Sequence, residues 1–217
     1  MRRVLVLLPC LAILTGCMGA FEDPSRHRSG PAFTPGPEAG QCLSSLGGTR
    51  ADFTPLPDRY FGAGCATVNT VRLTGLQSDS ASLALSNLGP VACPLASAFA
   101  AWARFGVDRA ARQILGSALV RIETMGSYSC RNVAGSERRS AHATANAIDI
   151  SGFALADGRR ITVLEGWNGG TASERRFLQV IHASACKRFG TVLGPGYNAT
   201  HQDHFHVEMS IGSSFCR

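Results

Sequence analysis

The chain has 217 residues, of which 45% are hydrophobic and 17% are charged, a composition that indicates a globular protein and excludes an intrinsically disordered one. This length suits one domain with a sizeable core. The formal net charge of +6 falls to +4 without Arg2 and Arg3, a mild excess that is compatible with an anionic cell-wall polymer as a neighbour but is not the signature of a nucleic-acid-binding protein.

The N-terminal segment, residues 1–16, has the pattern of a secretion signal peptide. A basic start at residues 2–3 precedes an apolar run at residues 4–14, which is too short to span a bilayer as a helix. The run ends in Leu-Thr-Gly-Cys17, which resembles a bacterial lipobox and implies cleavage before Cys17 and lipidation of its thiol. Since Met18 follows, and not Asp, we expect a lipid-anchored protein of the cell envelope, in the outer membrane and facing the periplasm. An ordinary cleaved signal peptide is the alternative.

Cysteine usage agrees with export. Apart from Cys17 and the signal peptide, the cysteines are Cys42, Cys65, Cys93, Cys130, Cys186 and Cys216. An even number in an oxidising compartment predicts three disulfides. The sequence does not determine the connectivity, and the pairs that we predict are Cys42–Cys65, Cys93–Cys130 and Cys186–Cys216.

The mature chain begins with a segment that lacks apolar periodicity. Residues 17–41 are rich in Pro, Gly, Ser and charge, which predicts a flexible tether in front of a domain over residues 42–217. Strand-like pieces at 67–73 and 81–85 are separated by Pro and Gly turns. We interpret residues 42–92 as a disulfide-stapled lead-in that packs on the main domain.

Apolar periodicity predicts the helices of that domain. Residues 94–115 carry apolar side chains at helical spacing, with Gly106 ending a first helix and 107–115 forming a second. Thr171 and Glu174 resemble a capping box that opens a helix over 172–189. We expect strands at 118–123, 147–153, 160–164 and 204–209, and a loop at 167–170.

Two short segments hold the side-chain set of a catalytic zinc site. The first carries His142 and Asp149 among small apolar residues, and the second carries His204 and His206. Catalytic zinc takes three nitrogen or carboxylate ligands and leaves a fourth position open for water. On a strand, residues two apart point to the same face, so one histidine of the pair can bind metal while the other acts on water.

These segments carry a family resemblance. The pattern Ser140-x-His142 with Asp149, followed by His204-x-His206, is similar to that of the lysostaphin / D-Ala-D-Ala metallopeptidase (Hedgehog-like) superfamily. Over roughly residues 40 to 217 the chain resembles the bacterial extensin-like C-terminal family. The residues that carry this second resemblance are Cys93-Pro94, Trp102, 126–131, 193–198 and 203–206. One departure is Ala145, where the superfamily usually has Gly.

The resemblance implies roles for individual residues. His142, Asp149 and His206 would be ligands of Zn²⁺, and His204 would be the general base. Arg131 matches an arginine that lies near the zinc and holds a peptide carboxylate or a developing oxyanion. A surface arginine is the alternative for this residue.

Five further residues are weaker candidates for the site: Ser140, Asp203 and Glu208 beside the ligands, and Tyr128 and His201 as donors to substrate. Asp203 or Glu208 would orient a histidine. On a strand, however, Asp203 would face away from His204.

The resemblance implies an α+β fold, with a small antiparallel sheet, helices packed on one side and a zinc-peptidase cleft across the sheet. The implied function is a zinc-dependent endopeptidase or carboxypeptidase that acts on peptidoglycan peptides, attached to the membrane through Cys17 and with no nucleic-acid partner. A catalytically inactive peptidoglycan-binding or envelope-structural lipoprotein is the alternative.

Overall fold

The computed structural model describes residues 36–210 and 214–217. The predicted signal peptide, Cys17 and most of the predicted tether lie outside these residues. The end of the tether prediction is wrong, because helix α1 (Pro37–Gly48) already begins at residue 37, with proline in its first turn. Within the described part of the chain, no helix is long and apolar enough to cross a membrane.

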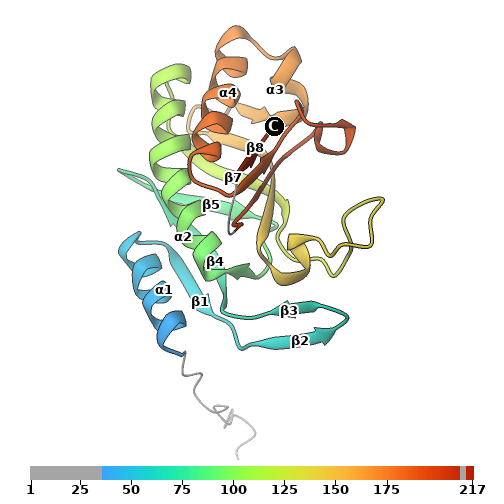
Figure 1. Cartoon of the computed structure of the whole chain (residues 1–217). Coiled ribbons are helices and arrows are strands. Elements are labelled where there is room, and N and C mark those ends of the chain that lie inside the picture. The colour runs from blue at the N-terminus through green and yellow to red at the C-terminus, as the bar shows by residue number, and fades with distance from the viewer. Residues whose placement is uncertain (1–35, 211–213) are drawn as a thin grey trace, which may run out of the picture. The chain divides into compact units, whose positions relative to one another are not determined.

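The described residues form an α+β fold, as predicted, but the sheet is larger than expected and mixed. Its strands are β1 (Asp52–Pro55), β4 (Thr70–Gln77), β5 (Ser82–Ser86), β6 (Val91–Ala92), β7 (Leu119–Gly126), β8 (Ala147–Leu155), β9 (Arg160–Thr162), β10 (Thr191–Leu193), β11 (Phe205–Glu208) and β12 (Phe215–Cys216). Their order is β1-β4-β5-β7-β8-β11-β10-β12, with β6 beside β4 and β9 beside β8. The prediction of an antiparallel sheet is wrong because β5–β7 and β10–β12 pair in parallel. Before residue 93, strands β1, β4, β5 and β6 extend this sheet, so this segment is not only a lead-in that packs on the domain (Figure 1).

A separate two-stranded hairpin consists of β2 (Arg59–Gly62) and β3 (Cys65–Thr67). Residues 62–64 form its turn with Gly62, Ala63 and Gly64 all at positive φ, the backbone region that glycine adopts without steric cost. The hairpin lies next to the short helix η3 (Ala141–Thr144), which carries His142.

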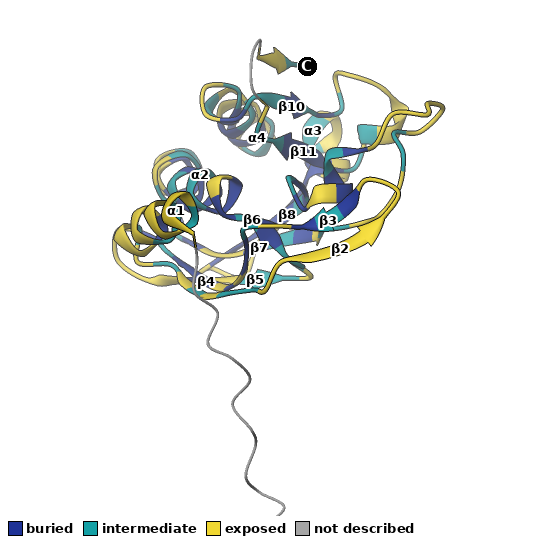
Figure 2. Cartoon of the chain, turned by 60° about the horizontal axis from the view of Figure 1, so that its bottom comes forward, coloured by how far each residue is buried: buried dark blue, intermediate teal, exposed yellow. Residues whose placement is uncertain are grey.

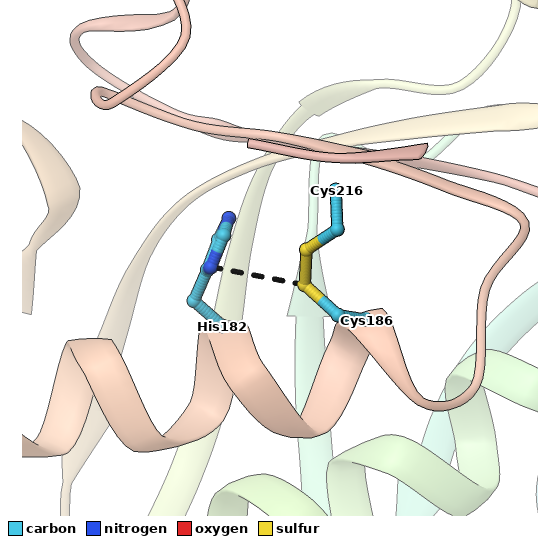
Figure 3. A group of neighbouring side chains, drawn as sticks. All are labelled: His182, Cys186 and Cys216. Atoms are coloured by element: carbon cyan, nitrogen blue, oxygen red, sulfur yellow. Dashed lines mark hydrogen bonds between the residues drawn. A yellow bond between two sulfur atoms is a disulfide. The ribbon is translucent and has the colours of Figure 1, made fainter. Parts of the chain in front are cut away.

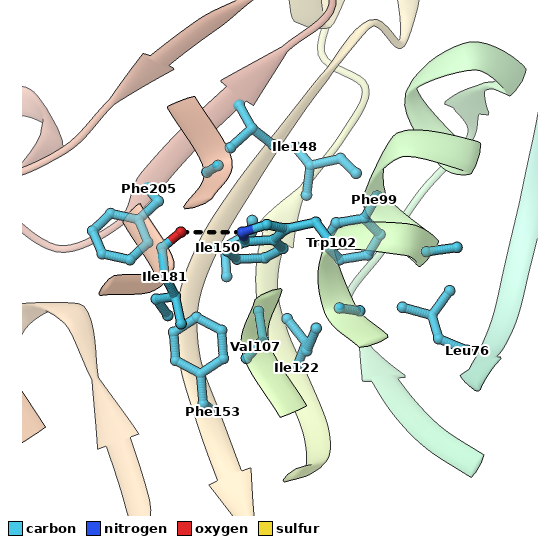
Figure 4. Close-up of a cluster of buried hydrophobic side chains, with 14 of the residues drawn as sticks. Leu76, Phe99, Trp102, Val107, Ile122, Ile148, Ile150, Phe153, Ile181 and Phe205 are labelled. Carbon is cyan, nitrogen blue, oxygen red and sulfur yellow. Dashed lines mark hydrogen bonds between the residues drawn. The ribbon is translucent and has the colours of Figure 1, made fainter. Parts of the chain in front are cut away.

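Helices α2 (Cys93–Trp102) and α4 (Ala172–Cys186) pack on the same face of the sheet. Phe153 of β8 contacts both Trp102 of α2 and Phe177 of α4, with ring centroids 6.3 and 5.5 Å apart. The buried Trp102 indole also donates a hydrogen bond to the Ile181 carbonyl of α4 (Figure 4). Trp102 therefore belongs to the layer that joins both helices to the sheet.

The helical region after α2 differs from the prediction, because no break occurs at Gly106. The chain continues through the π-helical turns η1 (Ala103–Asp108) and η2 (Ala111–Leu115) and ends at Gly116, which is left-handed. A Cβ at Gly106 would lie 2.7 Å from Ser184 Oγ, so this glycine permits close packing against α4 and does not end a helix.

The predicted loop at 167–170 is also wrong. Helix α3 (Val163–Gly169) occupies this segment, and Thr162 caps it by accepting a hydrogen bond from the Glu165 backbone N–H. Since Thr162 is the cap, β9 ends there and not at residue 164. The predicted capping box of Thr171 and Glu174 is confirmed, although α4 ends at Cys186 and not near residue 189.

Three disulfides staple the domain, as predicted, but two of the predicted pairs are wrong. The structure joins Cys42 to Cys93 and Cys65 to Cys130, in place of Cys42–Cys65 and Cys93–Cys130. The first bond ties α1 to α2, and the second ties the β2–β3 hairpin to the loop after β7.

The third predicted pair, Cys186–Cys216, is present and joins α4 to β12. His182, one helical turn before Cys186, lies beside this bond with Nδ1 3.9 Å from the Cys186 sulfur (Figure 3). Its Nε2 lies 3.2 Å from the Arg217 carbonyl. His182 is thus a partly buried, hydrogen-bonded histidine outside the predicted zinc site.

A β-bulge in β8 explains how one strand serves both the core and the cleft. Glu123 of β7 pairs with Gly152 and Thr124 pairs with Ile150, so Ser151 is the extra residue. An extra residue reverses the alternation of side chains. Ile150 and Phe153 therefore both reach the core, and Asp149 faces the other side of the sheet.

Candidate metal centre

A cleft of about 490 Å³ lies at the ends of β8 and β11. Its lining includes Asp149, His204, His206 and Glu208, together with residues of the loops at 131–144 and 197–201. Both segments singled out in the sequence therefore meet in one depression.

A capped 3₁₀ turn holds the buried His142 against Asp149, which lines this cleft. Ser140 is the N-cap of η3, and its hydroxyl accepts a hydrogen bond of 3.3 Å from the His142 backbone N–H. Ala145 ends the turn at φ 54°, in the left-handed region. This conformation favours glycine, since a Cβ costs about 1 kcal/mol there.

Asp149 and His206 are brought together by strand register. β8 and β11 are antiparallel, and these two residues are direct partners across the ladder. Their side chains therefore point to the same face, away from the helices, while the neighbouring pair of Phe205 and Ile150 points into the core.

The three predicted ligands converge within ligand distance of one another. His142 Nε2 lies 3.1 Å from Asp149 Oδ2, His206 Nδ1 lies 2.9 Å from Asp149 Oδ1, and the two nitrogens are 3.3 Å apart. Ligands about 2.1 Å from a tetrahedral zinc ion are separated by about 3.4 Å. The residues present thus fit a zinc ion with little rearrangement.

The other ring nitrogen of each of these histidines faces an oxygen acceptor. His142 Nδ1 lies 3.1 Å from the Ser127 carbonyl and His206 Nε2 lies 3.4 Å from Glu208 Oε2. A carbonyl accepts only, so His142 Nδ1 donates to it, and a neutral His142 ring has its free lone pair on Nε2, the nitrogen that faces Asp149. Glu208 favours the same arrangement for His206, with Nδ1 inward. Such outer partners orient histidine ligands of metals.

His204 lies beside the cluster, and one of its ring nitrogens also faces an oxygen acceptor. Its Nδ1 lies 2.7 Å from Asp203 Oδ1, and its Nε2 lies 3.6 Å from Asp149 Oδ1. The prediction that Asp203 faces away from His204 is wrong, because Asp203 lies in a turn before β11. The alternation of a strand does not apply in a turn.

The cluster is electrostatically coupled. Burial alone would raise the pKa of Asp149, but hydrogen bonds to His142 and His206 outweigh it and hold this pKa well below its usual range. Burial would lower the pKa of His206, whereas its contacts with Asp149 and Glu208 raise that pKa to about 9. Without a cation, a proton on His206 offsets the charge of Asp149.

His201 is a fourth histidine in the cleft, with its ring 5.1 Å from that of His204 and 5.9 Å from that of His206. Its Nδ1 lies 2.7 Å from Asn198 Oδ1. Burial first, and then the neighbouring histidines, lower the pKa of His201 to about 4. It is therefore neutral at pH 7 and can donate or accept a hydrogen bond.

Arg131 lines the cleft with an exposed side chain, and its carbonyl accepts a hydrogen bond from the Ser140 N–H. Arg138 and Arg139 line the same cleft, and none of these arginines forms an ion pair within residues 36–210 and 214–217. The structure does not place Tyr128 there, because its ring packs on Phe61 and lines a different depression.

Sequence reasoning missed two supports of the site, the Ser127 carbonyl and the Asn198 side chain. A backbone acceptor leaves no residue-type signal in a sequence. Asn198, by contrast, lies three residues before His201, a spacing that permits an Asx-type contact with a short helical turn.

Comparison with known proteins gives one match. The family of the extensin-like protein C-terminus matches residues 40–217, nearly all of the described chain. No curated protein and no solved structure matches.

Proposed function

The chain belongs to the family of the extensin-like protein C-terminus, and from its histidine–aspartate cluster we propose a zinc-dependent peptidase that hydrolyses peptide bonds of peptidoglycan at the cell envelope. One observation carries the proposal. His142, His204 and His206 each turn one nitrogen outward to an oxygen and the other toward Asp149. A histidine cluster that served only packing would have no need for three matched outer partners.

His142, Asp149 and His206 would hold the ion. When bound, zinc supplies an acidified water and polarises a carbonyl. The chain supplies the proton transfers: Asp203 holds the Nδ1 proton of His204, so that Nε2 accepts a proton from the attacking water and returns it to the leaving amine.

The cleft favours a carboxylate-bearing peptide as substrate. Arg131, Arg138 and Arg139 line it without acidic partners in the described chain, and arginine binds carboxylates through paired hydrogen bonds. Stem peptides of peptidoglycan carry such carboxylates. Export with a lipid at Cys17 would place the enzyme beside this polymer, at the periplasmic face of the outer membrane.

The test combines metal content with digestion of purified sacculi. We expect the purified domain to hold one zinc ion and to release soluble muropeptides. His204→Ala should lower the rate by roughly 10²- to 10⁴-fold while zinc is retained. His182→Ala, which removes a histidine outside the cleft, is the matched control and should retain activity. A zinc-loaded wild-type protein that leaves sacculi and cross-linked muropeptides intact contradicts the proposal and favours a wall-binding or structural lipoprotein.

A further inference from the structure

A second depression, of about 150 Å³, lies between the β2–β3 hairpin and the sheet. Its walls include the aromatic rings of Phe61 and Tyr128, which contact each other at 5.5 Å between centroids, and the exposed arginines Arg59 and Arg72. Phe61 is 52% exposed, although it is a large apolar side chain. Figure 2 shows β2 as exposed along its length.

The arginines of this depression are free of acidic partners. Within residues 36–210 and 214–217, neither Arg59 nor Arg72 forms an ion pair. The neighbouring Asp58 instead accepts a hydrogen bond from the Asn69 backbone N–H. The depression thus offers two aromatic faces and two sets of N–H donors to a ligand that supplies acceptors.

The depression lies near the metal-site cleft, although no residue lines both. Tyr128 and Arg131 belong to the same loop, which the Cys65–Cys130 disulfide ties to the hairpin. The Arg139 side chain, which lines the cleft, lies against Gly64 in the hairpin turn. A long ligand bound in one depression can therefore reach the other.

We propose that the Phe61–Tyr128 depression is a subsite for the glycan strand of peptidoglycan, binding an N-acetylhexosamine ring. This inference rests on the proposed function. The apolar face of a sugar ring stacks on the exposed Phe61 ring and the half-buried Tyr128 ring, and Arg59 and Arg72 donate hydrogen bonds to acetamido and ring oxygens. The volume is below the roughly 300–1,000 Å³ of a drug-sized pocket and suits a single ring.

A glycan accounts for these features better than a membrane surface does. Insertion into a bilayer requires a convex apolar tip, whereas the turn at residues 62–64 consists of Gly, Ala and Gly. The aromatic rings and the arginines instead line a concave surface next to the cleft. This arrangement would hold the strand while its attached peptide enters the cleft.

Calorimetry measures the binding of two probes to the purified protein. The probes are the N-acetylglucosamine tetramer and glycan strands from which an amidase has removed the peptides. We expect Phe61→Ala and Arg72→Gln each to weaken binding about tenfold. Tyr60→Ala is the matched control, because Tyr60 is 77% exposed on the same strand but does not line the depression. The Tyr60→Ala variant should bind both glycan probes with the affinity of the wild type.

Hydrolysis separates this inference from the function on which it rests. Phe61→Ala should cut a glycan-free cross-linked peptide at the wild-type rate but digest intact sacculi more slowly. Cleavage of the peptide without binding of either glycan probe overturns the glycan subsite and leaves the peptidase. Glycan binding without peptide cleavage keeps the glycan subsite and overturns the peptidase. Equal glycan binding by Phe61→Ala and wild type overturns the subsite. The subsite is also overturned if the protein binds vesicles of phosphatidylethanolamine and phosphatidylglycerol but neither glycan probe.

Discussion

Asp203 determines how His204 presents its reactive nitrogen. The carboxylate lies 2.7 Å from Nδ1, so it fixes the tautomer in which Nε2 lacks a proton and faces the cluster. Because an amide can donate as well as accept, Asp203→Asn would permit the wrong tautomer. A positioning residue of this kind affects rate more than metal affinity.

We therefore expect Asp203→Asn to lower the rate of peptide hydrolysis by about 10- to 100-fold and to retain one zinc ion. Steady-state kinetics, with elemental analysis in parallel, checks this. Asp203→Glu, which keeps the carboxylate, should recover part of the rate. Loss of zinc in Asp203→Asn would instead make the residue a support of the metal.

At the scale of single residues, the sequence predicted the members of the histidine–aspartate cluster better than it predicted the groups that contact them. The spacing of His142, Asp149, His204 and His206 identified the residues that converge. It proposed Asp203 as a residue that orients a histidine but predicted the wrong direction for this side chain, because strand alternation was applied to a residue that lies in a turn. Tyr128 was assigned to the wrong depression because loop direction depends on the Cys65–Cys130 bond, and connectivity is not encoded in spacing.

Among the elements, the β2–β3 hairpin depends on one covalent bond. It belongs to a two-stranded sheet of its own, and isolated hairpins are marginally stable in water. The Cys65–Cys130 disulfide closes a sequence separation of 65 residues and attaches this hairpin to the loop that carries Arg131.

Replacing both Cys65 and Cys130 with Ser should destabilise the domain by about 2–4 kcal/mol. Amide exchange should rise first in residues 59–67 and 127–131, as measured by mass spectrometry. The matched variant with Ser at Cys186 and Cys216 should raise exchange in α4 and β12 instead. A uniform rise over the chain in both variants would show that these staples act globally.

A second local interaction, the ion pairs of Asp79 with Arg104 and Arg109, joins the loop after β4 to the helical region after α2. Asp79 Oδ1 lies 2.7 Å from Arg104 Nε, and Oδ2 lies 2.8 Å from Arg109 Nε. Hydrogen bonds from Arg109 and then Arg104 lower the pKa of Asp79 to about 2. A depressed carboxyl pKa contributes stability above its unfolded-state value, and this contribution is lost as the pH falls through the folded-state value.

Wild type should therefore be more stable than Asp79→Asn at pH 7, with the difference in denaturation midpoint shrinking between about pH 4 and pH 2. Urea titrations across this range measure it. Glu137→Gln is the control, since Glu137 is exposed and forms no ion pair in the described chain. A difference independent of pH would mean that the ion pair does not stabilise the loop.

At the scale of the whole molecule, the domain is built on one mixed sheet. One face of this sheet packs against the hydrophobic core, and the other carries Asp149 and His206. Apolar periodicity predicted α2, α4 and the central strands, because each buries a face in the same core, but it missed α1 and α3. Strand order depends on contacts between distant segments, such as the parallel pairs β5–β7 and β10–β12. No local pattern reports these, so the predicted sheet was too small and wholly antiparallel.

Because the proposed ligands come from β11, β8 and η3, binding of zinc should stabilise the whole fold. At about 100-fold excess over Kd, binding to the native state adds about 2.7 kcal/mol, and each kcal/mol raises Tm by about 2–4 °C for a domain of this size. Thermal denaturation with and without zinc or a chelator measures this shift. Asp149→Ala should show no response to zinc, and an equal response would place the bound ion elsewhere.

The first two disulfides interleave along the chain, since Cys65 lies between Cys42 and Cys93, and Cys93 lies between Cys65 and Cys130. If the chain is exported as proposed, its cysteines would emerge in order, and oxidation on emergence would join Cys42 to Cys65 and Cys93 to Cys130. Formation of the native pairs would then require thiol–disulfide exchange after translocation. Cells without a disulfide isomerase should accumulate the protein with these consecutive pairs, which peptide mapping under non-reducing conditions would identify.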